Sequence, residues 1–416
     1  MMDKDLVPIK PLIFAERSCP ECGASGPVPV GVRFPGVHVM GEYVCSSCGF
    51  RFYHDLPVGF AVDHDVAIGK ETGELFDPKG AEAWVTTPLV NGFRSPSDEE
   101  VRIERRVLRS ARRVIVLNTL DFLYGHVLLK LWNAQHYLDA HPDMGLILIM
   151  PRMFEWLVPE GTAEVWLVDQ RLGKAHGWYR SIDRQLNAFL EDFDEVYLGK
   201  GFAHPDKARI DIARFCGVAP FDLDAFERAP KRIAFVLRED RLWFRTAMHK
   251  FLYRALGKIG LKRVVQGVFI ADQQCLAMAV LRLIKRDHPE TVATIVGLGA
   301  KRSVPQGVED LRTRTMDAET ELAWCRAYAS SQLVIGVHGS NMLLPTALAA
   351  GCIEVLPHDR YGNIVQDVAV RYRDVMQLFL YRFVDEFASP RTVARHARSI
   401  FKDFRVFHRN NRTNIH

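Results

Sequence analysis

The sequence predicts an α/β protein with two Rossmann-like domains in tandem and a small zinc ribbon before them. Three observations indicate this fold class. Buried strands alternate with amphipathic helices from about residue 112, the same alternation starts again near residue 231, and two C-x-x-C pairs lie near the N-terminus. Strands that alternate with helices are typical of a parallel, doubly wound sheet.

Size and composition limit the class of protein further. A chain of 416 residues is too long for one ordinary core, so we expect two large domains and a smaller element. The net charge of +4 is too small to indicate nucleic-acid binding. The N-terminal residues lack the apolar core of a signal peptide, and no run approaches the roughly 18 apolar residues of a membrane span. We therefore expect a cytoplasmic protein with no membrane span and no nucleic-acid partner.

Turn signals and composition divide the chain into regions. Strand and helix patterns favour a short linker near Ala229 and Pro230, and a charged helix from Ser97 to about Ser110 that begins with a capping box of Ser97 and Glu100. The two Rossmann-like domains would face each other across a cleft, with ligands at the carboxyl ends of their strands. The expected regions are the zinc ribbon (1–58), a hairpin and connector segment (59–100), the N-terminal Rossmann-like domain (101–229), the C-terminal Rossmann-like domain (230–375), and a C-terminal helix with a basic tail (376–416).

The cysteine pairs indicate a metal site. Cys19 and Cys22 form one C-x-x-C turn, Cys45 and Cys48 form the other, and a glycine follows each turn. Four thiolates presented by two such turns complete a tetrahedral structural zinc site. A redox pair or disulfides are the alternative. Because a closed four-cysteine site leaves no open position, we expect no catalytic metal there; the ribbon would pack on its own protein or dock a protein partner.

Basic residues gather around the start of the first Rossmann-like domain. They offer a polyanion site or a solvated helix face, and the acidic residues interspersed with them favour the solvated face. The arginines are Arg102, Arg105, Arg106, Arg109, Arg112 and Arg113.

One strand of the second domain ends in an unusual way. The apolar run LVIGV is followed by His338, Gly339, Ser340 and Asn341, and then by an apolar helical pattern. Free amides at the start of a helix, a glycine that permits close approach and a histidine donor suit a phosphate or diphosphate. The alternative is a helix cap and tight turn with a packed histidine.

Two further features support a ligand at this edge of the sheet. The first strand of the same domain ends in Arg238 and Arg241, which would open on the same side and could reach a diphosphate. Glu354 lies in the next strand and could accept hydrogen bonds from ribose hydroxyls. The alternatives are surface ion pairs for the arginines and pairing of Glu354 with a nearby arginine.

The stretch GVHGSNMLLPTALAAGCIEVLP resembles the G-x-H-G-A-x-L-x-N segment of inverting, metal-independent glycosyltransferases of GT-B fold, a family that includes xylosyl-, arabinosyl- and N-acetylglucosaminyltransferases. KRIAFVLREDR is similar to the arginine-ended strand of that family, and FLYGHVLLKLW to its Tyr-His-Trp-Leu segment. Ser340, Asn341 and Pro345 depart from the family pattern. The specific similarity covers residues 319–357.

The resemblance implies a function and roles for these residues. His338, Gly339, Ser340 and Asn341 would hold the diphosphate or sugar of a UDP- or GDP-linked donor, while Glu354 would face the nucleoside. Arg238 and Arg241 would neutralise the leaving nucleotide in place of a metal.

An inverting transfer also needs a base for the hydroxyl of the acceptor. The sequence does not identify the acceptor. The first strand of the N-terminal half ends near Asp121, and His126 opens the next helix. His126 is the base that the resemblance implies, and Asp121 is the alternative; a plain helix cap and a packed histidine also fit these residues. Two other functions stay open: a nucleotide-sugar epimerase or hydrolase of the same fold, and an inactive zinc-ribbon scaffold.

Overall fold

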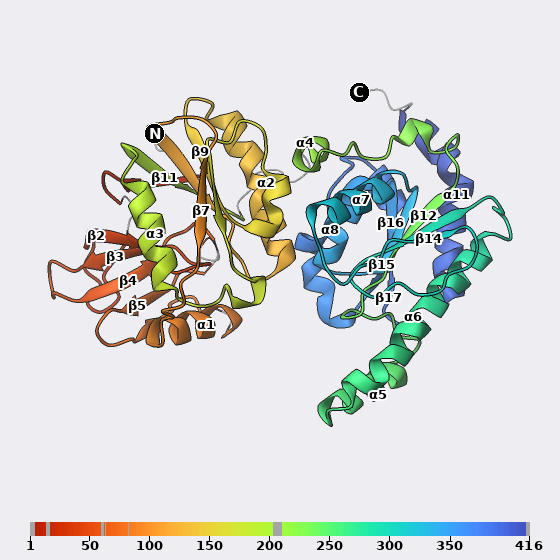
Figure 1. Ribbon diagram of the computed structural model, residues 1–416, viewed down its shortest axis with the longest axis horizontal. Helices are drawn as coiled ribbons and strands as arrows, with labels where there is room; N and C mark the ends of the chain where they lie inside the picture. Colours follow the sequence, from red (N-terminus) through yellow and green to blue (C-terminus); the bar gives the residue numbers. More distant parts are fainter. Residues whose placement is uncertain are drawn as a thin grey trace. The chain divides into compact units, whose positions relative to one another are not determined.

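A computed structural model of the chain describes residues 5–13, 17–59, 62, 64–81, 83–202 and 210–412. The chain divides into two compact units, residues 1–206 and 207–416 (Figure 1). Each unit contains a six-stranded sheet with helices on it, which confirms the predicted α/β class.

The sheet of the first unit has the order β1-β11-β8-β9-β10-β7. Strands β8 to β11 are parallel, whereas β1 and β7 pair antiparallel at the two edges. The central parallel strands are continuous apolar runs, because both of their faces are covered. The strands are β1 (Leu6–Lys10), β7 (Ile103–Val107), β8 (Arg113–Asn118), β9 (Gly145–Pro151), β10 (Glu164–Val168) and β11 (Glu195–Gly199).

A second, antiparallel sheet of the same unit carries the four cysteines. It packs on the parallel sheet through a shared core in which Tyr43 and Phe52 join Val116 and Trp166. Along the chain this sheet lies between the two edge strands β1 and β7 of the larger sheet. Its strands are β2 (Val28–Arg33), β3 (Met40–Val44), β4 (Arg51–Asp55), β5 (Ala67–Gly69) and β6 (Leu75–Phe76).

Helices cover the remaining faces of the first unit. Figure 1 shows α2 and α3 on opposite sides of the parallel sheet, with α3 on the side of the cysteine-bearing sheet. Helix α1 lies in the segment expected to hold hairpins and a connector. The helices are α1 (Ala83–Arg94), α2 (Tyr124–Ala140) and α3 (Arg180–Leu190), with short 3-10 turns η2 (Arg152–Leu157) and η3 (Leu172–Lys174).

The charged helix expected from Ser97 to Ser110 is wrong. The segment forms the edge strand β7, which pairs with β10 and buries Ile103. The predicted capping box is also absent, because Glu100 pairs with Arg184. Charge is no obstacle to a strand at this edge, where alternate side chains face solvent.

The sheet of the second unit has the order β14-β13-β12-β15-β16-β17, and all six strands are parallel. In chain order within the unit this is 3-2-1-4-5-6, the strand order of dinucleotide-binding doubly wound sheets. The strands are β12 (Arg232–Val236), β13 (Val292–Val296), β14 (Val308–Asp310), β15 (Leu333–Val337), β16 (Gly351–Leu356) and β17 (Tyr381–Asp385).

Two helical layers cover this sheet. Figure 1 shows α7 and α8 on one side and α6 with α11 on the other. Phe226, which precedes the sheet, stacks on Phe404 of α11 with ring centroids 3.7 Å apart, so Phe226 is part of this unit's core. The helices are α4 (Ile212–Cys216), α5 (Ala247–Lys258), α6 (Lys262–Ile284), α7 (Ala318–Ala329), α8 (Leu343–Leu348), α9 (Ile364–Asp367), α10 (Met376–Leu380) and α11 (Pro390–Arg412), with 3-10 turns η5 (Leu223–Ala225), η6 (Ser340–Met342) and η7 (His358–Asn363).

Helix α6 has an unusual composition. Among the described residues it is the one helix long and apolar enough to cross a membrane, with a mean hydropathy of 1.5. Of that stretch, 44% is buried inside the protein. The core helix of a globular unit passes the same test of length and composition, so the finding alone does not identify a membrane span.

Candidate functional site

The four cysteines of the first unit form one cluster. Their sulfur atoms all lie within 4.8 Å of one another. Cys19 Sγ lies 3.8 Å from Cys48 Sγ, and Cys22 Sγ lies 3.6 Å from Cys45 Sγ. All four cysteines are free, and these separations are far longer than the S–S bond of about 2.05 Å in a disulfide. Four sulfurs at about 2.3 Å from a central zinc ion would lie about 3.8 Å apart at the corners of a tetrahedron.

Two equivalent turns build this cluster. Gly23 donates its N–H to the carbonyl of Cys19 over 2.9 Å, and Gly49 does the same to Cys45. Both glycines have positive φ, at 73° and 75°, which a residue with a side chain rarely adopts. Among the described residues, these four cysteines are the group that could hold a metal ion.

The unusual end of strand β15 lies at the point in the second sheet where the strand order reverses. Strand β12 lies between β13 and β15: after β12 the chain adds β13 and β14 on one side of it, and then crosses to add β15, β16 and β17 on the other side. Ligands of open α/β sheets bind at the carboxyl ends of the strands at such a point. Arg238 and Arg241 follow β12, and His338 and Gly339 follow β15. The structure therefore brings these predicted residues together at the carboxyl ends of two neighbouring strands.

Arg241 and Gly339 are in direct contact. Arg241 Nη1 donates a hydrogen bond to the backbone carbonyl of His338 over 2.7 Å. A Cβ atom added to Gly339 would lie 1.2 Å from the same nitrogen, and Gly339 has φ 145°. No residue with a side chain can therefore replace Gly339 while Arg241 keeps this position.

The charge of Arg241 is not matched by a nearby carboxylate. Within the described part of the chain, no carboxylate oxygen lies within ion-pair distance of it, and Asp240 and Asp367 act on it only at longer range. Burial, together with the neighbouring charges of Arg360 and Arg238, lowers the pKa of Arg241. A half-buried cation beside two further cations is stabilised by an anion, so this end of the sheet suits a negatively charged ligand.

Arg238 differs from Arg241. It makes two hydrogen bonds of 2.8 Å to the carboxylate of Asp240, so its charge is already paired. This pairing matches the alternative considered for the arginines, and it leaves Arg241 as the stronger anion ligand of the two.

His338 and Glu354 form a fully buried pair. His338 Nδ1 lies 2.5 Å from Glu354 Oε2, and neither side chain is exposed. Burial raises the pKa of Glu354, although the bond to His338 acts against this rise. Glu354 thus orients the histidine ring. Its carboxylate is not exposed, so it does not face the space where we expected the nucleoside.

Several buried polar atoms at this edge have no protein partner. In the described residues these include Nε2 of His338, Oε1 of Glu354 and Oδ1 of Asn341. Buried polar groups are normally hydrogen-bonded, and exceptions call for a water molecule or a ligand. Ser340 and Asn341 are partly exposed, and Asn341 Nδ2 donates to the carbonyl of Val337 over 3.3 Å.

The helix that follows is shorter than the sequence predicts. A 3-10 turn, η6, leads into α8, which spans only Leu343–Leu348. The apolar helical pattern expected after Asn341 therefore forms a helix only in part, since Ala349 is extended and Gly351 begins β16. So short a helix has a weak dipole, and the guanidinium of Arg241 is the main source of positive charge here.

A second cluster lies at the corresponding point of the first sheet, beyond the end of β8. Asp121 is fully buried: its Oδ2 lies 2.9 Å from Nζ of the fully buried Lys130, and its Oδ1 lies 3.2 Å from Nδ1 of His126. Although burial acts to raise it, the charge of Lys130 and the bond from His126 lower the pKa of Asp121 to about 2. Asp121 is therefore a weak base that positions His126.

Lys130 is a site residue that the sequence analysis missed. Its Nζ also donates to the carbonyl of Leu120 over 2.7 Å and lies 5.1 Å from the ring centre of Phe202. A lysine within the apolar run VLLKLW was the available signal, because an unpaired lysine is almost never fully buried.

Other histidines lie near this cluster. His38 Nδ1 lies 2.6 Å from Asp55 Oδ2, and the His176 ring lies 3.4 Å from that of Phe122. Burial lowers the pKa of His176, on which the charges of Asp121 and His38 also act. Since the Asn118 side chain donates to Gly36 over 2.9 Å, the loop after β2 reaches the end of β8. The cysteine-bearing sheet thus contributes to this edge.

The arginines near residue 105 do not form an anion site. Arg105 pairs with Glu164 and Asp192, and Arg112 pairs with Asp194. Arg106 and Arg113 are also in ion pairs, and Arg109 donates to two backbone carbonyls, so acidic neighbours match four of these six charges.

Comparisons with known proteins assign no family to the chain. No family model matches it, and no curated protein matches its sequence.

Proposed function

We propose that this chain is a glycosyltransferase that moves a sugar from a nucleotide-linked donor to an acceptor hydroxyl, with inversion and without a catalytic metal. The observation that carries this proposal is Arg241, a half-buried guanidinium without a close carboxylate, at the reversal point of a parallel sheet with the order 3-2-1-4-5-6. The resemblance of residues 319–357 to GT-B glycosyltransferases agrees with it.

In the donor site the ligand group is the diphosphate. Arg241 would donate to phosphate oxygens, and Gly339 lets the anion approach the backbone closely. Charge builds up on the diphosphate as the bond to the sugar breaks, so a fixed cation stabilises the transition state more than the ground state. Glu354 fixes the ring of His338, and Ser340 with Asn341 can bond the sugar or a phosphate.

In the acceptor site the base is His126. The bond to Asp121 places the proton of the neutral ring on Nδ1, which makes Nε2 the basic nitrogen. Nε2 would take the proton of the acceptor hydroxyl as its oxygen attacks the sugar carbon. Asp121, held by Lys130, keeps the ring in this tautomer.

For the four-cysteine cluster we infer structural zinc. Four thiolates with tetrahedral spacing suit zinc, and they leave no open position for a substrate or a catalytic water. The ion would fix the turns at residues 19–23 and 45–49, and with them the sheet that carries His38 and Asp55.

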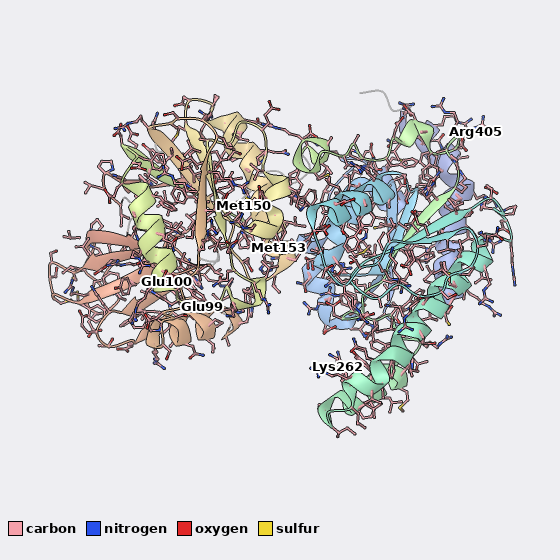
Figure 2. All side chains as sticks on the ribbon, in the orientation of Figure 1. Glu99, Glu100, Met150, Met153, Lys262 and Arg405 are labelled. Carbon is pink, nitrogen blue, oxygen red and sulfur yellow. The ribbon has the colours of Figure 1, made fainter. Side chains whose placement is uncertain are left out.

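Calorimetry with UDP, GDP and their sugars tests the donor site. We expect Arg241→Gln to weaken nucleotide binding about 10- to 100-fold, because one charge-assisted contact is lost. The matched control is Arg405→Gln on α11, an exposed position labelled in Figure 2, which should bind as the wild type does. Absence of binding in the wild type, or unchanged binding in Arg241→Gln, contradicts the proposal.

Product analysis separates the alternatives that share this fold. A glycosylated acceptor identifies a transferase, whereas a free sugar or an epimer identifies a hydrolase or an epimerase. Nucleotide binding without any turnover across a panel of acceptors favours the inactive scaffold. The zinc ribbon as a docking site for a protein partner stays a prediction.

A further inference from the structure

Residues 241–271 of the second unit contain no aspartate or glutamate. The same stretch contains many cations, while the whole chain has nearly equal numbers of both signs, with 54 basic and 50 acidic residues. The cations are Arg241, Arg245, Lys250, Arg254, Lys258, Lys262 and Arg263.

This stretch forms a helical hairpin. Helices α5 and α6 are joined by residues 259–261, where Gly260 has φ 81°. The two helices run antiparallel, since the rings of His249 and Tyr253 on α5 lie 4.6 Å and 4.8 Å from that of Phe269 on α6. Figure 1 shows α5 and the start of α6 extending beyond the rest of the second unit.

The hairpin exposes an unusual number of large apolar side chains. Helix α5 buries none of its residues. Met248, Phe251 and Leu252 lie on one face of α5, and Val264 and Val268 lie on one face of α6, at the spacing of successive helical turns. Ile259 and Leu261, in the segment that joins the helices, extend these faces. The exposed fractions are Met248 73%, Phe251 66%, Leu252 48%, Ile259 68%, Leu261 43%, Val264 77% and Val268 67%. Contiguous exposed apolar residues of this kind mark a binding surface.

Cations flank these apolar faces. Arg245 and Lys250 are paired with Asp272 and Glu386, and Arg241 belongs to the candidate donor site. The others, Arg254, Lys258, Lys262 and Arg263, are exposed, and within the described ranges none of them has an ion-pair partner. Figure 2 labels Lys262 on the projecting hairpin.

We propose that the α5–α6 hairpin docks the protein on an anionic membrane surface. Interfacial helices carry apolar side chains that enter the headgroup region and lysines and arginines that contact anionic lipids, which is the composition of this hairpin. This inference does not depend on the proposed transferase activity.

Charge selects this occupant over the others. A symmetric contact between two copies through the same face would bring eight unpaired cations together, with no acid in either hairpin to offset them. A nucleic acid would leave the aliphatic side chains uncovered, and Phe251 is the one exposed aromatic residue of the face.

In this proposal the hairpin lies on the membrane surface and does not span the membrane. The second half of α6 is packed into the unit, with Leu276, Ala277, Val280 and Ile284 buried. The lipid-facing part is therefore limited to α5 and the first two turns of α6.

Flotation of the full-length protein with vesicles tests the inference. We expect binding to vesicles of phosphatidylcholine with about one quarter phosphatidylglycerol, and weaker binding to phosphatidylcholine alone or in high salt. Phe251→Asp/Val264→Asp should abolish binding. Arg254→Gln/Lys258→Gln should weaken it about 25-fold, at about fivefold for each cation.

Matched controls exclude general effects of these changes. Leu378→Asp on α10 replaces a side chain that is 75% exposed, and Lys402→Gln/Arg405→Gln removes two cations from exposed positions of α11. Both controls should bind as the wild type does. No flotation with anionic vesicles at low salt overturns the inference, as does equal loss in the controls. Self-association that Phe251→Asp abolishes, without vesicle binding, would assign the face to a second copy.

Discussion

At the scale of the residue, Gly339 provides a direct test of the arginine that lies against it. Gly339→Ala would place a Cβ atom on the position of the Arg241 guanidinium. We expect Arg241 to be displaced and nucleotide affinity to fall at least about tenfold, because a misplaced donor loses its charge-assisted bond. Calorimetry with UDP and GDP measures the change.

Gly217→Ala is the control for this substitution. Gly217 also has positive φ, at 69°, and no atom lies within 4 Å of an added Cβ there. This variant carries backbone strain without the clash, so stability should fall slightly while nucleotide affinity stays the same. Equal affinities of Gly339→Ala and the wild type would contradict the placement of Arg241.

The buried pair of Asp121 and Lys130 predicts a large effect on stability. Asp121→Asn leaves the ammonium group of Lys130 buried without a carboxylate, which should destabilise the protein by about 3–5 kcal/mol. Adding Lys130→Met should restore part of this loss, because the unpaired charge is removed. Asp194→Asn breaks the exposed pair with Arg112 and should change stability by about 1 kcal/mol or less. Urea unfolding gives the free energy of unfolding of the wild type and the three variants. Equal losses in Asp121→Asn and Asp194→Asn would show that the buried pair stabilises the protein no more than the exposed pair does.

The same pair has a defined pH dependence. The pKa of Asp121 is about 2 in the folded protein, below the value of about 3.9 for an unfolded chain. Its contribution to stability is therefore complete above about pH 4 and is lost as the pH falls from about 4 to about 2. In urea unfolding, the difference between the wild type and Asp121→Asn should shrink over that window.

Some site residues could be predicted from sequence and others could not. His338 and Gly339 were found because an apolar run stops abruptly at them, and the end of such a run can be recognised from the sequence alone. The sequence did not distinguish Arg238 from Arg241 as anion ligands, because they differ in an ion pair, Arg238 with Asp240, that only the structure shows. Lys130 was missed because its partner Asp121 comes into contact only through the turn between β8 and α2.

At the scale of the element, the cysteine-bearing sheet should depend on its metal. Cys19→Ser/Cys45→Ser removes two of four ligands, so we expect loss of the ion and loss of amide protection in β2 to β4, because metal binding supplies folding free energy in small closed sites. Metal analysis, with one zinc ion per chain expected, and hydrogen exchange measure this. Cys275→Ser, at an exposed cysteine outside the cluster, should keep the ion and the protection. A fully folded wild type without metal would refute the inference.

Elements with apolar runs were predicted better than elements whose state depends on a neighbour. The buried strands of both sheets were recognised, since parallel strands are apolar throughout. Strand β7 was taken for a helix because its charged residues fit helical spacing equally well, and only pairing with β10 decides between the two. Helix α6 and strand β17 were not expected. Helix α6 is ordered by packing against α11, which follows it by many residues, and β17 by pairing with β16, which precedes it.

At the scale of the whole molecule, both sheets share a central plan. Four parallel strands in each have the order third, second, first, fourth, as β10-β9-β8-β11 and as β14-β13-β12-β15. Right-handed crossovers and short connections restrict sheets to few such orders. The repeated alternation of strand and helix predicted parallel sheets, but it gave no strand order. The edge strands differ between the sheets and left no comparable pattern in the sequence.

The edges of the first sheet have a consequence for how the chain is made. Strand β1 pairs with β11, and β7 pairs with β10, so both edge strands are synthesised before their partners. A nascent chain emerges from the ribosome N-terminus first, and β1 has no partner until residue 199 has emerged. Along the chain the cysteine-bearing sheet lies between these two strands, and its four cysteines, the proposed metal ligands, are all available once Cys48 has emerged. Capture of the proposed metal ion would then precede folding of the parallel sheet, which waits for its last strand.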